Sequence, residues 1–313
     1  ILNSKQISKR LIQMAIVLLG ISFITFSLIY MAPGDPVRAM YSSSGVMPSE
    51  EVLNQTREAM GLNKPFLVQY FDWLTSCLQG DFGTSYSSGK PVLGILMDRL
   101  IPTLKLAFLS LIIMLVIAVP SGIIAAIKQN KFADYLIRGI TFLGISMPNF
   151  WVGLLLLYVV ALKLNLLPVI SIGGGFKTMI LPAVTLAFAM AAKYTRQVRT
   201  AVLEELNKDY VIGAKARGLS DGKILLRHVF PNSLLPLITL LGLSLGSLLG
   251  GTAVVEVIFS YPGLGNLAVT SITAYDYPII QAYVLWIALI YMIINLIVDL
   301  SYTLVDPKVR ERG

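Results

Sequence analysis

The stretch that decides the fold runs from Lys193 to Asn232 and reads KYTRQVRTAVLEELNKDYVIGAKARGLSDGKILLRHVFPN. Its part between residues 193 and 227 carries eight of the 25 Lys and Arg residues of the chain, and long apolar segments lie on both sides of it. A basic loop of this size is costly to move across a bilayer and stays in the cytoplasm. The stretch also has the pattern of two short amphipathic helices joined at a glycine, which suits the docking of a soluble partner.

The composition is that of an integral membrane protein. Of the 313 residues, 56% are hydrophobic and 13% are charged, whereas soluble domains have about 25% charged residues. One cysteine, Cys77, excludes an internal disulfide framework and a cysteine metal cluster. One histidine, His228, removes most histidine-based metal sites and catalytic pairs. We therefore expect no catalytic, cofactor-binding or metal-binding residues in this chain.

Apolar segments predict six membrane-spanning helices. Five of them have at least 21 residues and are long enough to cross the hydrocarbon core. The sixth has only 14 residues before Lys193, so it spans a membrane only if its helix continues through Tyr194 and Val198. The five long segments are 11–31, 106–127, 140–162, 234–259 and 279–300, and the short one is 179–192.

The distribution of basic residues favours six spans with both termini in the cytoplasm. This topology places three Lys and Arg residues of the N-terminal tail, three in 128–138, eight in 193–227 and three in 308–312 on the cytoplasmic side, 17 of the 25. Five spans would place one basic end outside, against the positive-inside rule. Between the first two spans, the sequence predicts outer helices from Ser49 to Gly61 and from Pro65 to Gly80.

Two groups of residues inside the spans are candidates for a translocation pathway. Gly242, Gly246 and Gly250 recur every four residues, which indicates either close helix packing or the lining of a narrow pore. Ser146, Pro148 and Asn149 interrupt an apolar run, because proline removes a backbone donor and frees carbonyl groups. Such a break either lines a cavity or is a kink satisfied by neighbouring helices.

The sequence supports neither an intramembrane enzyme nor a secondary transporter, and it has no ATPase motif. No G-x-x-x-x-G-K-[ST] motif is present, so this chain does not hydrolyse ATP itself. An intramembrane enzyme needs a buried nucleophile and base, and a secondary transporter needs embedded charges for ion coupling. The polar residues Glu256, Asn295 and Asp299 fall near span ends, where we interpret them as interfacial groups rather than a proton relay.

The basic loop shows the pattern of a helical hairpin. Leu203, Leu206 and Tyr210 share one helical face with Ala214. Gly218 suits the left-handed conformation that ends a helix, and Ser220 or Asp221 then caps a second short helix. A solvated cytoplasmic hairpin has the same pattern as a docking element, so periodicity alone leaves both interpretations open.

Gly218 followed after nine residues by His228-Val229-Phe230-Pro231 resembles the loop EAA-x3-G-x9-I-x-LP of ATP-binding-cassette importer permeases. The match is partial, since Ile212-Gly213-Ala214 stands in place of Glu-Ala-Ala and His228 replaces the apolar residue. The form DYVIGAKARGL (209–219) is similar to the peptide and nickel branch of that family. Further similar stretches follow in order over almost the whole chain: MAPGDPV (31–37), DFGTS (81–85), SMPNFW (146–151), MILPAV (179–184), IFSYPGLG (258–265), DYPIIQ (276–281) and NLIVDLSYTLVDPKVR (295–310).

The resemblance implies an all-α type-1 importer permease in the cytoplasmic membrane of a prokaryote. It implies a helix and tail at 1–31, an extracytoplasmic segment at 32–100, a permease core at 101–303 with a coupling loop near 203–231, and a tail at 304–313. The implied partners are a second homologous permease, two cytoplasmic ATPases that hold ATP and magnesium, and an extracytoplasmic binding protein, with no nucleic acid. The coupling residues that we expect are Tyr210, Ala214, Arg217, Gly218 and Leu219.

The substrate expected from the resemblance is nickel, carried as a chelate. The linker between Val169 and Met179 is short and similar to that of nickel-type members. The chain has no evident metal cage, so a separate binding protein would select the cargo. Import of dipeptides or oligopeptides is the alternative.

Overall fold

The structure is a computed structural model that describes residues 4–42, 48–171 and 175–305. These residues form helices and connecting loops, with no strand among them. The chain divides into two compact units, which we describe one at a time. Unit 1 comprises Ile1–Asn3, Leu104–Tyr261 and Ile293–Gly313, and unit 2 comprises Ser4–Thr103 and Pro262–Met292.

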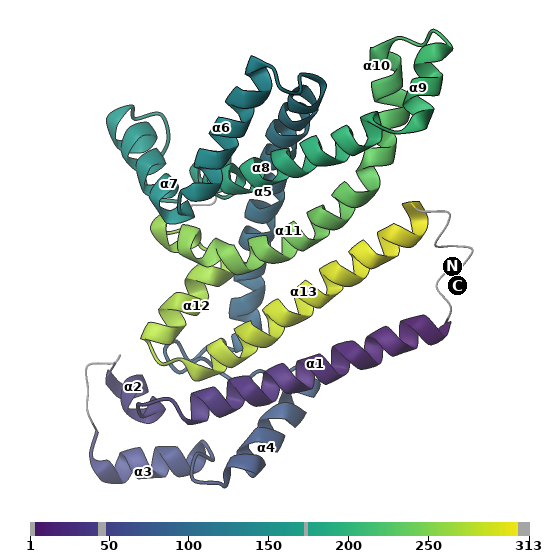
Figure 1. The fold of residues 1–313 in the computed structure, drawn as a ribbon. Helices are drawn as coiled ribbons and strands as arrows, with labels where there is room; N and C mark the ends of the chain where they lie inside the picture. The colour runs from purple at the N-terminus through teal and green to yellow at the C-terminus, as the bar shows by residue number, and fades with distance from the viewer. Residues whose placement is uncertain (1–3, 43–47, 172–174, 306–313) are drawn as a thin grey trace. The chain divides into compact units, whose positions relative to one another are not determined.

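Unit 1 is built around α8 (Phe176–Leu206), which packs against α6 (Phe132–Ser146), α7 (Asn149–Leu156) and α11 (Phe230–Ile258) (Figure 1). Its remaining elements are the second half of α5 (Val92–Ile127), the π-helical turns Leu157–Lys163 and Leu225–Val229, the short helices α9 (Asp209–Ala216) and α10 (Asp221–Ile224), and the end of α13 (Tyr277–Val305). Buried alanine, valine and leucine side chains of α8 form the core between these helices.

The weak sixth span is one continuous helix. α8 continues beyond Lys193 to Leu206, with Tyr194 and Val198 buried and Lys193 exposed. A lysine at the edge of the hydrocarbon can place its ammonium group in water while its stem covers apolar surface. The expectation that this segment continues through Val198 is therefore confirmed.

In the part of the chain that the structure describes, four helices are long and apolar enough to cross a membrane, and the count rises to six if each of two bent helix pairs is one span. The first pair, α6 with α7 and the following π-helical turn, bends by 101°. The second, Asp221–Leu234 with Pro236–Gly246, bends by 47°. The sequence predicted one apolar span over 140–162, but its helix ends at Ser146 and a new one begins at Asn149.

Unit 2 contains α1 (Ser4–Tyr30), α2 (Pro36–Ser42), α3 (Glu50–Ala59), α4 (Phe66–Leu78), the first half of α5, α12 (Leu264–Thr273) and the first half of α13. α4 packs on α1 through an aromatic cluster in which Phe26 lies 5.4 Å from Trp73 and 5.6 Å from Tyr70 between ring centroids. Both predicted outer helices are present, and each is followed by a left-handed glycine, Gly61 and Gly80. Ser49 stands at the N-cap of α3 without a capping side-chain hydrogen bond.

One interpretation of the sequence was wrong. Glu256, which we expected to be solvated near the end of a span, is completely buried in α11. The error arose because distance from the end of an apolar run does not show which side of a helix other helices cover. Asn295 is partly exposed, and the side chain of Asp299 lies outside the described part of the structure.

Candidate functional site

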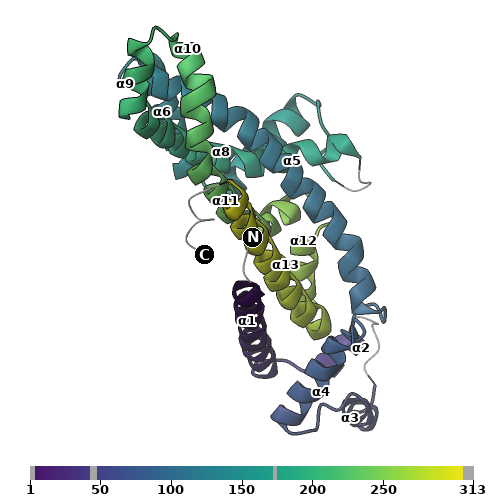
Figure 2. The same cartoon turned by 90° about the vertical axis from the view of Figure 1, so that its right-hand side faces the viewer.

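The predicted hairpin is formed by α9 and α10, which lie side by side in Figures 1 and 2. Gly218 has φ +78°, the left-handed conformation expected for it. The Gly218 amide donates to the carbonyl of Lys215 at 2.9 Å, and the Leu219 amide donates to that of Ala214 at 3.2 Å. These are the two bonds of a Schellman motif, which satisfies the last carbonyl groups of α9. Gly218 therefore ends α9 and turns the chain into α10.

The hairpin is joined to α8 by a hydrophobic cluster. Val198 and Val202 of α8, Ala214 of α9 and Ile224 of α10 are each no more than 2% exposed and belong to one packed group. Because this core crosses from α8 into both hairpin helices, a displacement of the hairpin is transmitted to α8 through close-packed side chains. This connection favours a docking element over a mobile solvated loop.

The hairpin and the turn after it each carry an exposed apolar side chain. Ile212 of α9 is 65% exposed, and Leu226, in the π-helical turn that follows α10, is 67% exposed. Arg217 and Gly218, between α9 and α10, are also exposed. A partner protein that docks here can cover these side chains.

The five predicted coupling residues have different positions in this hairpin. Arg217 and Gly218 lie on the free surface, Ala214 faces the core, and Tyr210 and Leu219 are half-buried. The Tyr210 hydroxyl donates to Glu205 Oε2 at 2.8 Å, and Lys208 bonds the other carboxylate oxygen of Glu205 at 2.5 Å. Tyr210 thus fixes the turn between α8 and α9.

An ion pair that the sequence analysis missed lies next to this cluster. Asp134, fully buried in the first turn of α6, accepts hydrogen bonds from Arg199 of α8 at 2.7 and 2.8 Å. It also accepts the backbone N–H of Asn130 at 3.0 Å. The two residues are 65 positions apart, so no local pattern indicates their contact. The one available signal was that Asp134 is an acid among the basic residues of 128–138.

A glycine of α5 lies in close contact with α8, at the residue next to Arg199. A Cβ atom at Gly122 would lie 2.6 Å from Cβ of Val198 and 2.8 Å from the Thr195 carbonyl oxygen. Real Cβ atoms do not approach other atoms so closely, so only glycine fits there. α5 and α6 are therefore both held against the same part of α8, around Val198 and Arg199.

The candidate pathway residues lie in two parts of unit 1. Ser146 is exposed, and its hydroxyl donates to the Phe142 carbonyl of its own helix at 2.9 Å. Pro148 lies in the break between α6 and α7, and Asn149 is the first residue of α7. A helix break at membrane depth needs partners for its freed carbonyl groups from protein or from water in a cavity.

The glycine stripe of α11 includes one close helix contact. A Cβ atom at Gly242 would lie between 2.2 and 2.8 Å from side-chain atoms of Val298 in α13. Gly246 is buried, and Gly250 lies in the same helix. At Gly242 the structure therefore favours packing, the first of the two interpretations of the stripe.

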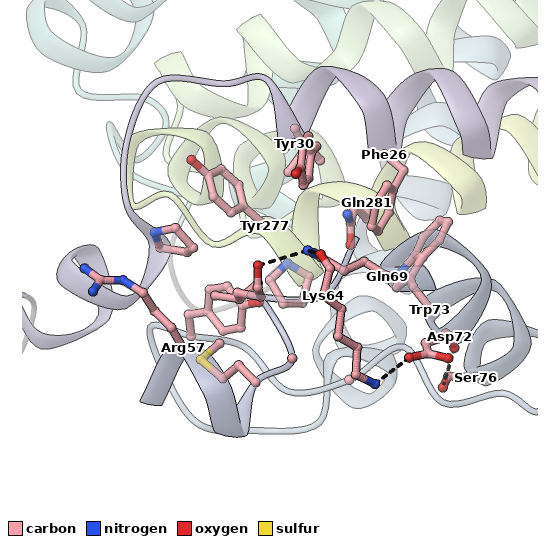
Figure 3. Close-up of a pocket in the computed structure, with 18 of the residues that line it drawn as sticks. Phe26, Tyr30, Arg57, Lys64, Gln69, Asp72, Trp73, Ser76, Tyr277 and Gln281 are labelled. Carbon is pink, nitrogen blue, oxygen red and sulfur yellow. Dashed lines mark hydrogen bonds and ion pairs between the residues drawn. The ribbon is translucent and has the colours of Figure 1, made fainter. Parts of the chain in front are cut away.

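Unit 2 contains a cavity of about 610 Å³, shown in Figure 3. Its walls combine aromatic rings, among them Phe26, Tyr30 and Trp73, with charged and amide side chains. The Lys64 ammonium group contacts Asp72 at 2.7 Å, and Arg57 pairs with Asp35. The volume lies within the range of about 300–1,000 Å³ that is usual for small-molecule sites. No sequence pattern predicted this cavity, because the residues that line it are far apart in the chain.

A buried carboxylate binds the loop that forms part of the cavity wall. Asp276, 1% exposed, accepts hydrogen bonds from the Ser85 hydroxyl at 2.5 Å and from the Tyr86 and Ser87 amides at 3.0 and 3.2 Å. These bonds hold the loop after α4 against the start of α13. Burial raises the pKa of Tyr86 to about 12, and the negative charge of Asp276 adds to this shift.

Bent and continuous apolar helices, with a helical hairpin packed on one of them, are those of a membrane protein with several spans. Residues 118–311 match the family described as binding-protein-dependent transport system inner membrane component, and residues 4–107 match the N-terminal family of the same membrane components. The chain belongs to this family of importer permeases, within its peptide and nickel branch. Its relatives are permease proteins of transport systems, not enzymes.

Several curated relatives match nearly the full chain. A nickel import system permease protein of Staphylococcus aureus is 40% identical, with 98% of this chain and 92% of the relative covered. A glutathione transport system permease protein of Escherichia coli is 37% identical, with 96% and 97% covered. A probable D,D-dipeptide transport system permease protein of Escherichia coli is 35% identical, with 96% of each chain covered.

Solved structures confirm the fold. A chain of the inward-facing methionine ABC transporter MetNI is similar with a TM-score of 0.59 at 18% identity, over 68% of this chain and 97% of that chain. The predicted all-helical type-1 importer permease fold is therefore confirmed.

Proposed function

We propose that this chain is the translocation subunit of an ATP-driven importer and that α9 and α10 receive the movement of a cytoplasmic ATPase. The single observation that supports this most strongly is the continuous core from α8 into the hairpin, with Ile212 of α9 and Leu226 of the turn after α10 left exposed. Binding of an ATPase would cover these side chains. α8 would then carry the displacement into the helices that surround the pathway.

The remaining subunits follow from the family to which the chain belongs. A second permease completes the pathway, two ATPases bind ATP and magnesium, and an extracytoplasmic protein delivers the cargo. Both termini and the hairpin lie on the cytoplasmic side, as the distribution of basic residues favours. The domain boundaries at residues 31, 100 and 303 belong to the same proposal.

Nickel, held in a chelate, is the cargo that we propose. The 40% identity to the nickel permease and the short linker after Val169 support it. Among the described residues no group of three His, Cys, Asp or Glu side chains is placed to hold a metal ion. Selection by a separate binding protein, with the metal wrapped in organic ligands, agrees with that arrangement.

Import of short peptides is the second candidate cargo. The 37% and 35% identities to the glutathione and D,D-dipeptide permeases favour it nearly as strongly. The organic part of a nickel chelate and a peptide share amine, carboxylate and amide groups, so the same pathway can accept either.

Transport in proteoliposomes tests both parts of the proposal. The assembled importer would be supplied with radioactive nickel, alone or with histidine as the chelator, and in parallel with a labelled dipeptide. ATP-dependent uptake of the nickel–histidine complex supports the first cargo, and uptake of the dipeptide alone supports the second. Uptake that continues without the ATPases contradicts the importer mechanism.

The surface contact has its own test. Ile212→Asp and Leu226→Asp should each weaken copurification of the ATPase, because a charge replaces an apolar contact in the interface. Phe132→Asp is the matched control, since Phe132 is 81% exposed at the start of α6, outside the hairpin. Unchanged copurification with both hairpin variants would contradict docking at this surface.

A further inference from the structure

Three sequence stretches without an assigned role meet around the outer cavity of unit 2. The lining includes residues of MAPGDPV (31–37), of DFGTS (81–85) and of DYPIIQ (276–281), which are far apart in the chain. The first stretch contributes Ala32, Gly34, Asp35 and Pro36 to the lining, the second contributes Asp81, Phe82, Gly83 and Thr84, and the third contributes Tyr277, Pro278 and Gln281. If each stretch only stabilised its own part of the fold, the three would not need to line one cavity. Their meeting there indicates a shared role.

Several charged and polar groups of the cavity are already bonded within the protein. Arg57 is held by Asp35, and Lys64 by Asp72. The Gln69 amide nitrogen donates to the carbonyl oxygen atoms of Leu62 and Lys64, at 3.0 and 2.7 Å. These groups shape the wall, and they have little capacity left for a ligand.

Gln281 also lines the cavity, but its side chain is not bonded within the protein in this way. It belongs to the second turn of α13 and is only 8% exposed, yet its carboxamide lines the cavity (Figure 3). The side chain makes no hydrogen bond to another described residue, and neither of its polar atoms is among those sealed from solvent without a partner. A buried amide is normally hydrogen-bonded. Its two donor hydrogens and its acceptor oxygen therefore remain open to a ligand in the cavity that Gln281 lines.

The chemistry of these groups suits the backbone of an amino acid or short peptide. A carboxamide donates and accepts side by side, and a residue in an extended peptide presents its own N–H and C=O to the same side. Phe26, Tyr30 and Trp73 offer an aromatic surface for an apolar side chain of the ligand. We propose that this cavity is an outer binding site for a short peptide or amino-acid-type ligand, bonded by Gln281.

This inference deepens the proposed function, on which it rests, by naming the part of the cargo that the permease contacts. The backbone chemistry has two sources: a free peptide, or the amino-acid chelator that carries nickel. The site binds weakly, because one amide and one aromatic surface are few contacts and a translocating protein must release its cargo.

Binding to the full chain in lipid nanodiscs tests the site without ATPases. Saturation-transfer NMR would be recorded with glycyl-leucine, with its N-methylated peptide-bond analogue, with nickel–histidine and with nickel chloride. Gln281→Leu removes the hydrogen bonds at nearly constant volume. Gln79→Leu is the matched control, because Gln79 is exposed at the end of α4 and does not line the cavity.

We expect saturable binding of glycyl-leucine, of nickel–histidine or of both, which identifies the source of the ligand. Gln281→Leu should raise the Kd at least fivefold and Gln79→Leu should leave it unchanged; if glycyl-leucine binds, N-methylation should raise its Kd too. Absence of binding by both organic probes, equal binding by the Gln281→Leu variant, or binding of nickel chloride alone would overturn the site. Those results leave ATP-dependent uptake unaffected, so they are distinct from failure of the importer function.

Discussion

Arg199 holds Asp134 with two parallel hydrogen bonds, from Nε to Oδ1 at 2.7 Å and from a terminal nitrogen to Oδ2 at 2.8 Å. The carboxylate is fully buried and the Arg199 side chain is 19% exposed. Such a bidentate pair fixes orientation as well as distance. It therefore sets the position of α6 on α8 two turns before α8 ends.

Removing one partner of this pair should destabilise the protein strongly. Asp134→Asn leaves the Arg199 charge largely buried without its counter-ion, which costs about 3 kcal/mol or more. The midpoint of thermal unfolding in detergent measures the loss. Lys64→Gln, which removes an ion pair with Asp72 whose side chains are 53% and 58% exposed, is the control and should lower the midpoint far less. The double variant Asp134→Leu with Arg199→Met should recover part of the loss, and equal stability of Asp134→Asn and wild type would contradict this role.

Gly218 should be needed for coupling because of its left-handed backbone conformation, not because a side chain would lack room there. No atom lies within 4 Å of the place where a Cβ atom would be, so Gly218→Val suffers only the left-handed φ, about 1–2 kcal/mol. Gly218→Asn tolerates that conformation and should retain ATP-coupled uptake, whereas Gly218→Val should lose most of it. Gly222→Ala, also in open space, is the control. Equal uptake by the Val and Asn variants would refute a conformational role.

Gly242 distinguishes packing from pathway lining. Gly242→Ala should lower the yield of folded protein, because the new methyl group overlaps Val298. Overpacking of this kind destabilises a folded protein by about 2 kcal/mol. Val298→Ala in the same chain should restore the yield by making room. Folding yield is measured by size-exclusion chromatography of the detergent extract. A normal yield with altered cargo selectivity would instead assign Gly242 to the pathway.

Cys77 should react slowly with thiol reagents. Burial, with the charge of Asp81 adding to it, raises the pKa of the Cys77 thiol from an ordinary 9.0 to about 12. At pH 8 the reactive thiolate is therefore scarcer by about a thousandfold. The rate of maleimide labelling should keep rising with pH above 9, where an ordinary thiol levels off. A plateau near pH 9 would contradict the effect of burial.

Topology is therefore better tested with new cysteines in a Cys77→Ser background. Lys90→Cys and Ser220→Cys place thiols at exposed positions, and Ser220 makes no capping side-chain bond that the change would break. In intact cells an impermeant maleimide should label the first and spare the second. Labelling of Ser220→Cys from outside would reverse the proposed orientation.

Local chemistry made part of this structure predictable. Gly218 decides the hairpin turn through its own backbone preference, and Pro148 ends α6 because it cannot continue the hydrogen-bonding pattern. Likewise, the length of α8 follows from apolar spacing that continues past Lys193. Each of these features depends on residues within a few turns of one another.

Contacts between distant segments could not be predicted in this way. Asp134 finds Arg199 only once α6 lies on α8, and Gln281 faces the outer cavity only because α13 packs beside the loop after α4. Glu256 shows the same limit, since burial of its side chain depends on neighbouring helices. The candidate site was therefore predicted in its hairpin and missed in its cavity.

The length of α8 has one further consequence. At about 1.5 Å per residue its 31 residues extend over about 46 Å, whereas the hydrocarbon core is about 30 Å thick. Each residue of the helix also turns the chain by about 100°. Inserting or deleting one residue between Lys193 and Leu206 would therefore rotate the α9–α10 hairpin by more than a quarter turn about the axis of α8. The number of residues in this segment is therefore as constrained as their identity.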